Sequence, residues 1–253
     1  MNRYELRYTP SGHALIFPGD RADVVVDALM ETGYVDEFCL SPSFDAAFVA
    51  SLMSAGFLVM SLRAPEITGT GGAILLPKLH LHRAVLALDE LRETRSAVRL
   101  LKRYELRVDV YFEAVLDRCA AVHGDDWLTD ELRAAFLGIR KLARTAEAAP
   151  ARLVSFALFR EDRLVAGEFG VVVGGVYTSY SGYRDEPSAG TVQMILTGRH
   201  LRDSGFAFWD LGMPMEYKTA LGARAIVRKE FVSRFRAARE LSAQSMPSRT
   251  VRA

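Results

Sequence analysis

The chain contains 253 residues, of which half are hydrophobic and a quarter are charged, and its formal net charge is +1. A charge this close to zero gives no overall attraction to nucleic acid, so any electrostatic partner must be recognised by a local patch. The sequence contains no apolar run of the roughly 18–20 residues that cross a bilayer and begins without a signal pattern, so we expect a cytoplasmic globular protein.

The first part of the chain has the pattern of a small α/β subdomain. Asp20 and Ser43 can each cap a helix, because their side-chain oxygens accept hydrogen bonds from backbone N–H groups of the first turn. We predict a small N-terminal subdomain over residues 1–65 and a larger domain over residues 66–240. Residues 241–253 are polar and have no apolar period, so we expect a disordered tail there.

A helix is predicted from Ala84 to Tyr104, where apolar residues recur at helical spacing. Basic residues three and four positions apart form one stripe on this helix, and Lys102 extends its basic end: Arg92, Arg95, Arg99 and Arg103. Such a stripe is usually a solvated face, balanced here by acidic neighbours. It can also bind phosphates, since basic residues outnumber acidic ones from Lys78 to Arg107.

The stretch from Val154 to Ala223 has the pattern of an α+β core. Apolar and polar residues alternate around turn signals, which indicates antiparallel strands, and Gly174–Gly175 suits a two-residue hairpin turn. A loop from Arg184 to Gly190 precedes a helix, and a short strand, Phe206 to Leu211, follows it. The loop offers backbone N–H groups to an anion or a carbonyl. We expect a central, mostly antiparallel sheet flanked by helices.

The sequence contains no motif for a metal or a bound cofactor. The five histidines are scattered, and no HExxH, CxxC, GxSxG or P-loop occurs. Cys39 and Cys119 are isolated and are interpreted as buried structural thiols. We therefore expect neither a metal nor a cofactor.

Several blocks between Phe57 and Phe235 form a specific order: Leu79–Arg83, Lys102–Val108, Asp126–Thr129, Arg160–Val171, Ser181–Arg184, Ser188–Thr191, Asp210 and Thr219–Ala223. In that order and spacing they resemble the leucyl/phenylalanyl-tRNA–protein transferase family, of which this chain would be a divergent member. The core of the family is similar to GNAT acyltransferases, with a small N-terminal domain in front. The family takes Leu, Phe or Met from a charged tRNA and joins it to a protein with an N-terminal Lys or Arg.

The resemblance implies roles for individual residues. Asp210 matches an acidic residue of the family and would orient the attacking amine or accept its proton, or else be structural. Trp127 matches a tryptophan near the terminal adenosine, where an indole can stack, or else anchors the core. Other positions implied for the aminoacyl end are Met60, Ser179, Ser188, Gly190, Thr191, Leu196 and Gly212. Residues implied in tRNA binding are Arg83, Arg92, Arg95, Arg99, Lys102 and Arg103.

Two polar groups of the family are replaced in this chain. Ser179, Tyr180 and Ser181 stand where the family has Gly-Glu-Ser, and Gly212 stands where it has a glutamine. Either Tyr180 acts catalytically with Asp210 in another arrangement, or the donor or acceptor differs, or the activity is reduced.

Three functions stay open on this basis. The first is aminoacyl transfer from charged tRNA to the N-terminal amine of a protein, which needs no cofactor because the tRNA ester is already activated. The second is acyl transfer from an acyl-CoA, with the loop from Arg184 to Thr191 holding CoA. The third is non-catalytic binding of tRNA or of degradation-signal peptides.

Overall fold

The computed structural model describes residues 4–64, 72–124, 127–145, 151–241, 246 and 249–252. The chain divides into two compact units, each assembled from segments that are distant in sequence. The first unit comprises Met1–Leu81, Gly124–Arg152 and Val227–Arg236, and the second comprises His82–His123, Leu153–Ile226 and Ala237–Ala253. This division differs from the single boundary between residues 65 and 66 that we predict from the sequence.

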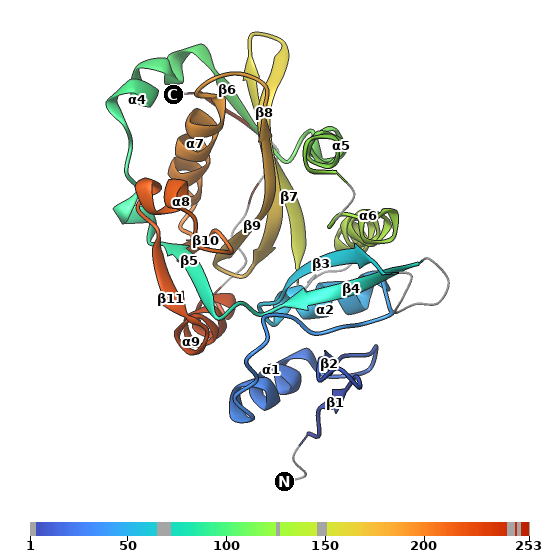
Figure 1. The fold of residues 1–253 in the computed structure, drawn as a ribbon. Coiled ribbons are helices and arrows are strands. Elements are labelled where there is room, and N and C mark those ends of the chain that lie inside the picture. The colour runs from blue at the N-terminus through green and yellow to red at the C-terminus, as the bar shows by residue number, and fades with distance from the viewer. Residues whose placement is uncertain are drawn as a thin grey trace. The chain divides into compact units, whose positions relative to one another are not determined.

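The second unit is built on an eight-stranded sheet with the order β11-β5-β10-β9-β8-β7-β6-β12 (Figure 1). Its strands are β5 (His82–Leu86), β6 (Glu105–Val108), β7 (Arg152–Arg160), β8 (Arg163–Val173), β9 (Val176–Arg184), β10 (Phe208–Asp210), β11 (Arg224–Val227) and β12 (Arg249–Arg252). The pairs β5–β10, β6–β7, β6–β12 and β8–β9 are antiparallel, and β9–β10 is parallel. The predicted mixed α+β class with a mostly antiparallel sheet is confirmed.

The β8–β9 hairpin forms at the glycine pair that the sequence indicates. Val173 pairs directly with Val176, so Gly174 and Gly175 make a two-residue turn. Gly174 has φ 53°, which a residue without Cβ adopts at little cost. The register shifts farther along the hairpin, where Tyr180 of β9 is the extra residue of a bulge opposite Phe169 and Gly170.

Helices cover both faces of this sheet (Figure 1). α7 (Ala189–Asp203) packs against β8 and β9, and α5 (Phe112–His123) contacts the same two strands from the opposite face. The α7 face holds a core in which Tyr177 and Trp209 are fully buried with Val192 and Ile195 of α7. The remaining helical segments of this unit are η1 (Leu88–Glu90), α4 (Arg95–Leu100), η2 (Leu101–Arg103) and α8 (Glu216–Leu221).

The predicted continuous helix from Ala84 to Tyr104 is wrong. Its first residues belong to β5, where Val85 pairs with Asp210 and Leu86 with Trp209. Both side chains are buried, so the strand is apolar on both of its faces, and a short apolar run of this kind cannot be told from a buried helix by periodicity. The rest forms only short helical segments, in which the hydroxyl of Thr94 caps α4 by accepting a hydrogen bond from Ala97 N–H.

The first unit combines the N-terminal segment with two later helices. Its elements are β1 (Arg7–Tyr8), β2 (Ala14–Leu15), α1 (Ala22–Glu31), α2 (Ala46–Ser54), the antiparallel pair β3 (Leu58–Arg63) and β4 (Ala73–Lys78), α6 (Asp130–Thr145) and most of α9 (Arg228–Arg239). Asp45, rather than Ser43, caps α2, because its carboxylate accepts from Phe48 N–H. Asp20 does not cap α1; its carboxylate accepts from Phe17 N–H.

Part of the segment predicted as a disordered tail is structured. Arg249–Arg252 form β12 at the sheet edge, and Met246 is buried in the core of the second unit. Cys39 and Cys119 are free and buried, which agrees with their interpretation as structural thiols, and burial raises the pKa of each to about 12. Within the described residues, no helix is long and apolar enough to cross a membrane.

Candidate functional site

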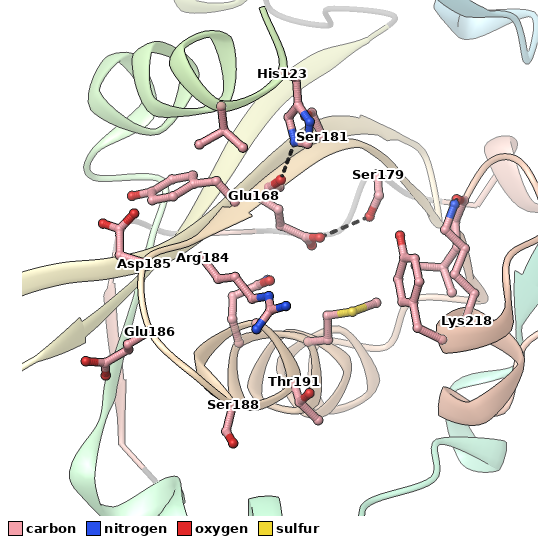
Figure 2. A pocket seen from close by; sticks show the side chains of 18 of the residues that line it. His123, Glu168, Ser179, Ser181, Arg184, Asp185, Glu186, Ser188, Thr191 and Lys218 are labelled. Atoms are coloured by element: carbon pink, nitrogen blue, oxygen red, sulfur yellow. Dashed lines mark hydrogen bonds between the residues drawn. The ribbon is translucent and has the colours of Figure 1, made fainter.

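A cavity of about 850 Å³ opens beside β9 in the second unit (Figure 2). We call it the β9 cavity. It is lined by the end of α5, the middle of β8, β9 with the loop that follows it, the start of α7, and the segment around α8. These residues are Val122, His123, Glu168, Ser179 to Ser188, Gly190, Thr191, Gln193, Met194, Leu211, Tyr217 and Lys218.

The cavity exists because two neighbouring strands part. β10 runs parallel to β9 for three pairs and ends at Asp210, opposite Thr178. From Ser179 to Arg184, β9 continues to pair with β8, so its other edge faces the cavity after β10 has ended. An opening next to a strand edge presents backbone groups as well as side chains to a ligand.

Glu168 projects from β8 into this cavity (Figure 2). Glu168 is only 5 % exposed, and its two carboxylate oxygens accept hydrogen bonds from the hydroxyls of Tyr177 and Ser179, each at 3.3 Å. Burial raises the pKa of the Glu168 carboxyl to about 7, although the neighbouring donors and the charge of Lys218 act in the opposite direction. The group can therefore exchange a proton near neutral pH.

A further hydrogen bond, from Trp209, orients the Ser179 hydroxyl that donates to Glu168. The indole Nε1–H of Trp209 donates to Ser179 Oγ at 2.7 Å, which leaves the serine hydroxyl proton to point at Glu168. Trp209 is fully buried, so the relay from Trp209 through Ser179 to Glu168 is held in one geometry.

Lys218 closes another side of the cavity. Its Nζ donates to the carbonyl oxygens of Leu211 at 2.6 Å and of Met213 at 2.7 Å, which fixes the segment after β10. Desolvation by burial lowers the pKa of Lys218. Lys218 therefore satisfies two carbonyl groups, and its positive charge lies near enough to Glu168 to act on the pKa of that carboxyl.

Asp210 is predicted to orient the attacking amine or to accept its proton, which requires a carboxylate that reaches the cavity. Its carboxylate is fully buried and accepts from Arg83 Nε at 3.2 Å, Arg83 Nη2 at 2.6 Å, Thr178 Oγ1 at 3.0 Å and Gly212 N–H at 2.9 Å. Four donors occupy its two oxygens, and Asp210 does not line the β9 cavity. The structure favours the structural alternative for Asp210 over the role of proton acceptor.

Arg83 is also placed differently from the prediction. It is 1 % exposed and forms the other half of the buried ion pair with Asp210. A guanidinium in this position cannot meet a tRNA phosphate, so the prediction that Arg83 binds tRNA is wrong.

The structure brings five other predicted residues together in the β9 cavity: Ser179, Tyr180, Ser188, Gly190 and Thr191. The Tyr180 ring stacks on Phe169, with 6.0 Å between ring centroids and 22° between planes. Ser188, at φ 67°, precedes the first turn of α7, where backbone N–H groups have no acceptor within the helix. The predicted anion- or carbonyl-receptive loop therefore lies at the cavity.

Four further residues predicted for the aminoacyl end do not line the cavity. Leu196 is buried in the core beneath α7. Gly212 makes the turn after β10 with φ 74°, a conformation that favours glycine over the glutamine of the family. Met60, on β3, and Trp127 belong to the first unit, where Ser61 N–H and Oγ both donate to the Trp127 carbonyl oxygen, at 2.9 and 2.8 Å.

The five basic residues of the predicted stripe are all exposed, although they do not share one helix. Arg95 and Arg99 lie on α4, Lys102 and Arg103 on η2, and Arg92 in the connection that precedes α4. Their binding of tRNA stays a prediction.

Glu168, Tyr217 and Lys218 are cavity residues that the sequence reasoning missed. One signal was available for Glu168, since it is a lone carboxylate inside the strongly apolar stretch from Val165 to Val173, and glutamate is rarely buried without a reason. Tyr217 and Lys218 carry no such signal, because α8 is short and polar.

The sequence matches the family model for leucyl/phenylalanyl-tRNA protein transferase over residues 85–236. The chain belongs to this family. The matched range contains the strands and helices that line the β9 cavity, from the end of α5 to α8. Family membership therefore applies to the part of the molecule that carries the cavity.

Similar proteins carry the same family name. A leucyl/phenylalanyl-tRNA–protein transferase of Rubrobacter xylanophilus is 33 % identical over 172 residues, which cover 66 % of this chain and 84 % of that protein. One from Pseudomonas aeruginosa is 33 % identical over 156 residues, which cover 59 % of this chain and 65 % of that protein. The alignment with the Pseudomonas protein thus spans slightly less than two thirds of its length.

Solved structures match at low similarity. A GCN5-related N-acetyltransferase from Anabaena variabilis is 9 % identical with a TM-score of 0.38, over 86 % of this chain and 53 % of that chain. A conserved protein of unknown function from Bacteroides thetaiotaomicron is 12 % identical with a TM-score of 0.40, over 82 % and 73 %. Structural similarities with TM-scores this low carry no information about the substrate of this protein.

Proposed function

We propose that this protein transfers an aminoacyl group from a charged tRNA to the N-terminal amine of an acceptor protein. The observation that carries the proposal is the family match over residues 85–236, a range that contains the residues lining the β9 cavity. We further propose that Leu, Phe or Met is the transferred residue, that the acceptor begins with Lys or Arg, and that the reaction takes place in the cytoplasm, where charged tRNA is found.

The chemistry of the cavity supports aminoacyl transfer. An aminoacyl ester is already activated, so the reaction requires a held ester, a neutral amine and donors near the developing oxyanion, and we propose that it needs no cofactor. The first turn of α7 supplies backbone donors at Gly190 and Thr191. Met194 and Leu211 supply an apolar wall for the side chain of Leu, Phe or Met.

The size of the cavity fits a small group rather than a macromolecule. Its volume of about 850 Å³ lies within the ordinary range of roughly 300–1,000 Å³ for ligand sites. We infer that it takes the aminoacyl end of the tRNA and the first residue of the acceptor, while the remaining tRNA is bound elsewhere on the protein.

A transfer assay tests this function. The full chain is incubated with radiolabelled Leu-, Phe- or Met-tRNA and a peptide beginning with Arg, and we expect label to appear in the peptide. The same peptide with an acetylated N-terminus is the control and should receive none, because it has no free amine. Absence of label, together with thermal stabilisation of the protein by CoA, would replace this proposal by acyl transfer from CoA.

A further inference from the structure

Among the residues that the structure describes, three carboxylates line the β9 cavity, and they differ in their partners. Asp185 contacts Arg118, and Glu186 contacts Arg163 at 3.2 Å and the Tyr104 hydroxyl at 2.9 Å. Both lie in the loop before α7, and their arginine partners come from α5 and from β8. Glu168 lies deeper, on β8, and its hydrogen-bond donors are uncharged side chains rather than arginine.

We propose that the Glu168 carboxylate accepts the proton of the acceptor α-amine, so that the neutral amine attacks the aminoacyl ester held in the β9 cavity. This inference rests on the proposed function and names the proton acceptor within it. The carboxylate is buried, faces the cavity, and is held by the relay from Trp209 through Ser179.

The proton and electron balance is complete with the two substrates alone. Glu168 takes one proton from the α-ammonium group, and the nitrogen lone pair forms the new bond to the ester carbonyl carbon. The bond between that carbon and the ribose oxygen then breaks, and the ribose oxygen takes the second proton from nitrogen. Amide and free tRNA leave, and Glu168 returns its proton to solvent.

The proton affinity of Glu168 suits this step. An α-ammonium has a pKa of about 7.7–8.0 in water, and the pKa of Glu168 is about 7, so the transfer between them is nearly balanced. An ordinary exposed glutamate, with a pKa of about 4.3, would be a weaker base by roughly three pKa units. Burial in the cavity wall therefore tunes Glu168 toward this role.

Other groups near the cavity are poorer candidates. Asp210 already accepts four hydrogen bonds and does not line the cavity. The Nε2 atom of His123 is within 2.8 Å of the Gly182 carbonyl oxygen and so serves as a donor there. Lys218 donates its protons to two carbonyl oxygens.

The central experiment compares Glu168→Gln with Glu105→Gln in the transfer assay. The amide that Glu168→Gln introduces can still form hydrogen bonds with the hydroxyls of Tyr177 and Ser179, so we expect an unchanged melting temperature and unchanged affinity for aminoacyl-tRNA. We expect kcat to fall by about 10²–10⁴-fold, the usual contribution of a positioned general base. Glu105 pairs with Arg107 on β6, away from the cavity, and its variant should keep the wild-type kcat.

The pH profile gives a readout that a structural role would not change. Only the ionised Glu168 accepts a proton, so wild-type kcat should rise with pH through about 7. Ser179→Ala removes a donor that favours the ionised form, so its acid limb should move to higher pH. The titration of the acceptor amine is common to all variants, because the same peptide is used with each.

The outcomes separate this inference from the proposed function. The role of Glu168 is supported if the wild type transfers label, Glu168→Gln loses about a hundredfold in kcat, and the acid limb of the pH profile of Ser179→Ala moves to higher pH. Transfer by the wild type with kcat of Glu168→Gln within threefold overturns that role and leaves the function standing. No transfer by the wild type overturns the function, and the inference about Glu168 falls with it.

Discussion

At the scale of single residues, the buried pair Arg83–Asp210 is a stability element. Both side chains are at most 1 % exposed, and Asp210 also binds Thr178 and the turn at Gly212. Taking one charge away from such a pair leaves the other buried without compensation. The pair thus fixes the end of β10 next to the β9 cavity.

We therefore expect Asp210→Asn to destabilise the fold by about 3–5 kcal/mol, the usual cost of breaking a buried ion pair. Urea unfolding followed by circular dichroism measures this loss. Glu230→Gln is the control, since its partner Arg234 is exposed and such surface pairs contribute about 0–1 kcal/mol. Full stability of Asp210→Asn combined with loss of transfer would return Asp210 to the catalytic machinery.

The sequence placed residues at the cavity where their position depends on local geometry, and missed cavity residues where the position depends on burial and strand pairing. Ser188, Gly190 and Thr191 reach the cavity because a loop before a helix exposes its backbone there. Tyr180 stands where the family has a glutamate, and the most deeply buried of the cavity carboxylates belongs to Glu168 on the neighbouring strand. The strand register pairs Glu168 with Gly182, two residues along β9 from Tyr180, and only this pairing of two strands brings Glu168 to that part of the cavity.

At the scale of elements, local signals decided which predictions held. The β8–β9 hairpin, α7 and the short strand β10 follow from glycine pairs and apolar periodicity, and all three are observed. The prediction of one helix from Ala84 to Tyr104 is wrong because its first residues form β5, which pairs with β10 from a distant part of the chain. This pairing cannot be recognised from the spacing of apolar residues in the segment itself.

The basic segment α4–η2 has a testable role despite being shorter than predicted. If its exposed arginines contact tRNA phosphates, Arg95→Ala with Arg99→Ala should weaken tRNA binding and reduce the slope of log K against log salt by about 1 for each lost contact. Binding is measured by filter retention across a salt series.

A matched variant separates this effect from a simple change in net charge. Lys229→Ala with Arg234→Ala removes two exposed positive charges from α9 and should leave the salt slope unchanged. An identical slope in wild type and in the α4 variant would make the basic segment a solvated surface.

At the scale of the whole molecule, the first unit is assembled from three parts of the chain. The guanidinium of Arg228, at the start of α9, donates to the carbonyl oxygens of Tyr34 at 2.5 Å and of Asp36 at 2.6 Å. Phe231 and Phe235 of α9 are buried, and both rings lie against Gly56. The N-terminal segment thus completes its hydrogen bonds and its core with residues more than a hundred positions later.

This arrangement predicts that residues 1–65 do not fold alone, although the sequence pattern marks them as a subdomain. The fragment lacks β4, the partner of β3, and lacks the α9 side chains that fill its core. A chain of this length is marginal even with a complete core, and without these partners it buries too little apolar surface to offset the entropy of ordering it. We expect no cooperative urea transition for the fragment, whereas the full chain should show one. A sigmoidal transition with slowly exchanging amides in α1 and α2 would instead establish an autonomous N-terminal domain.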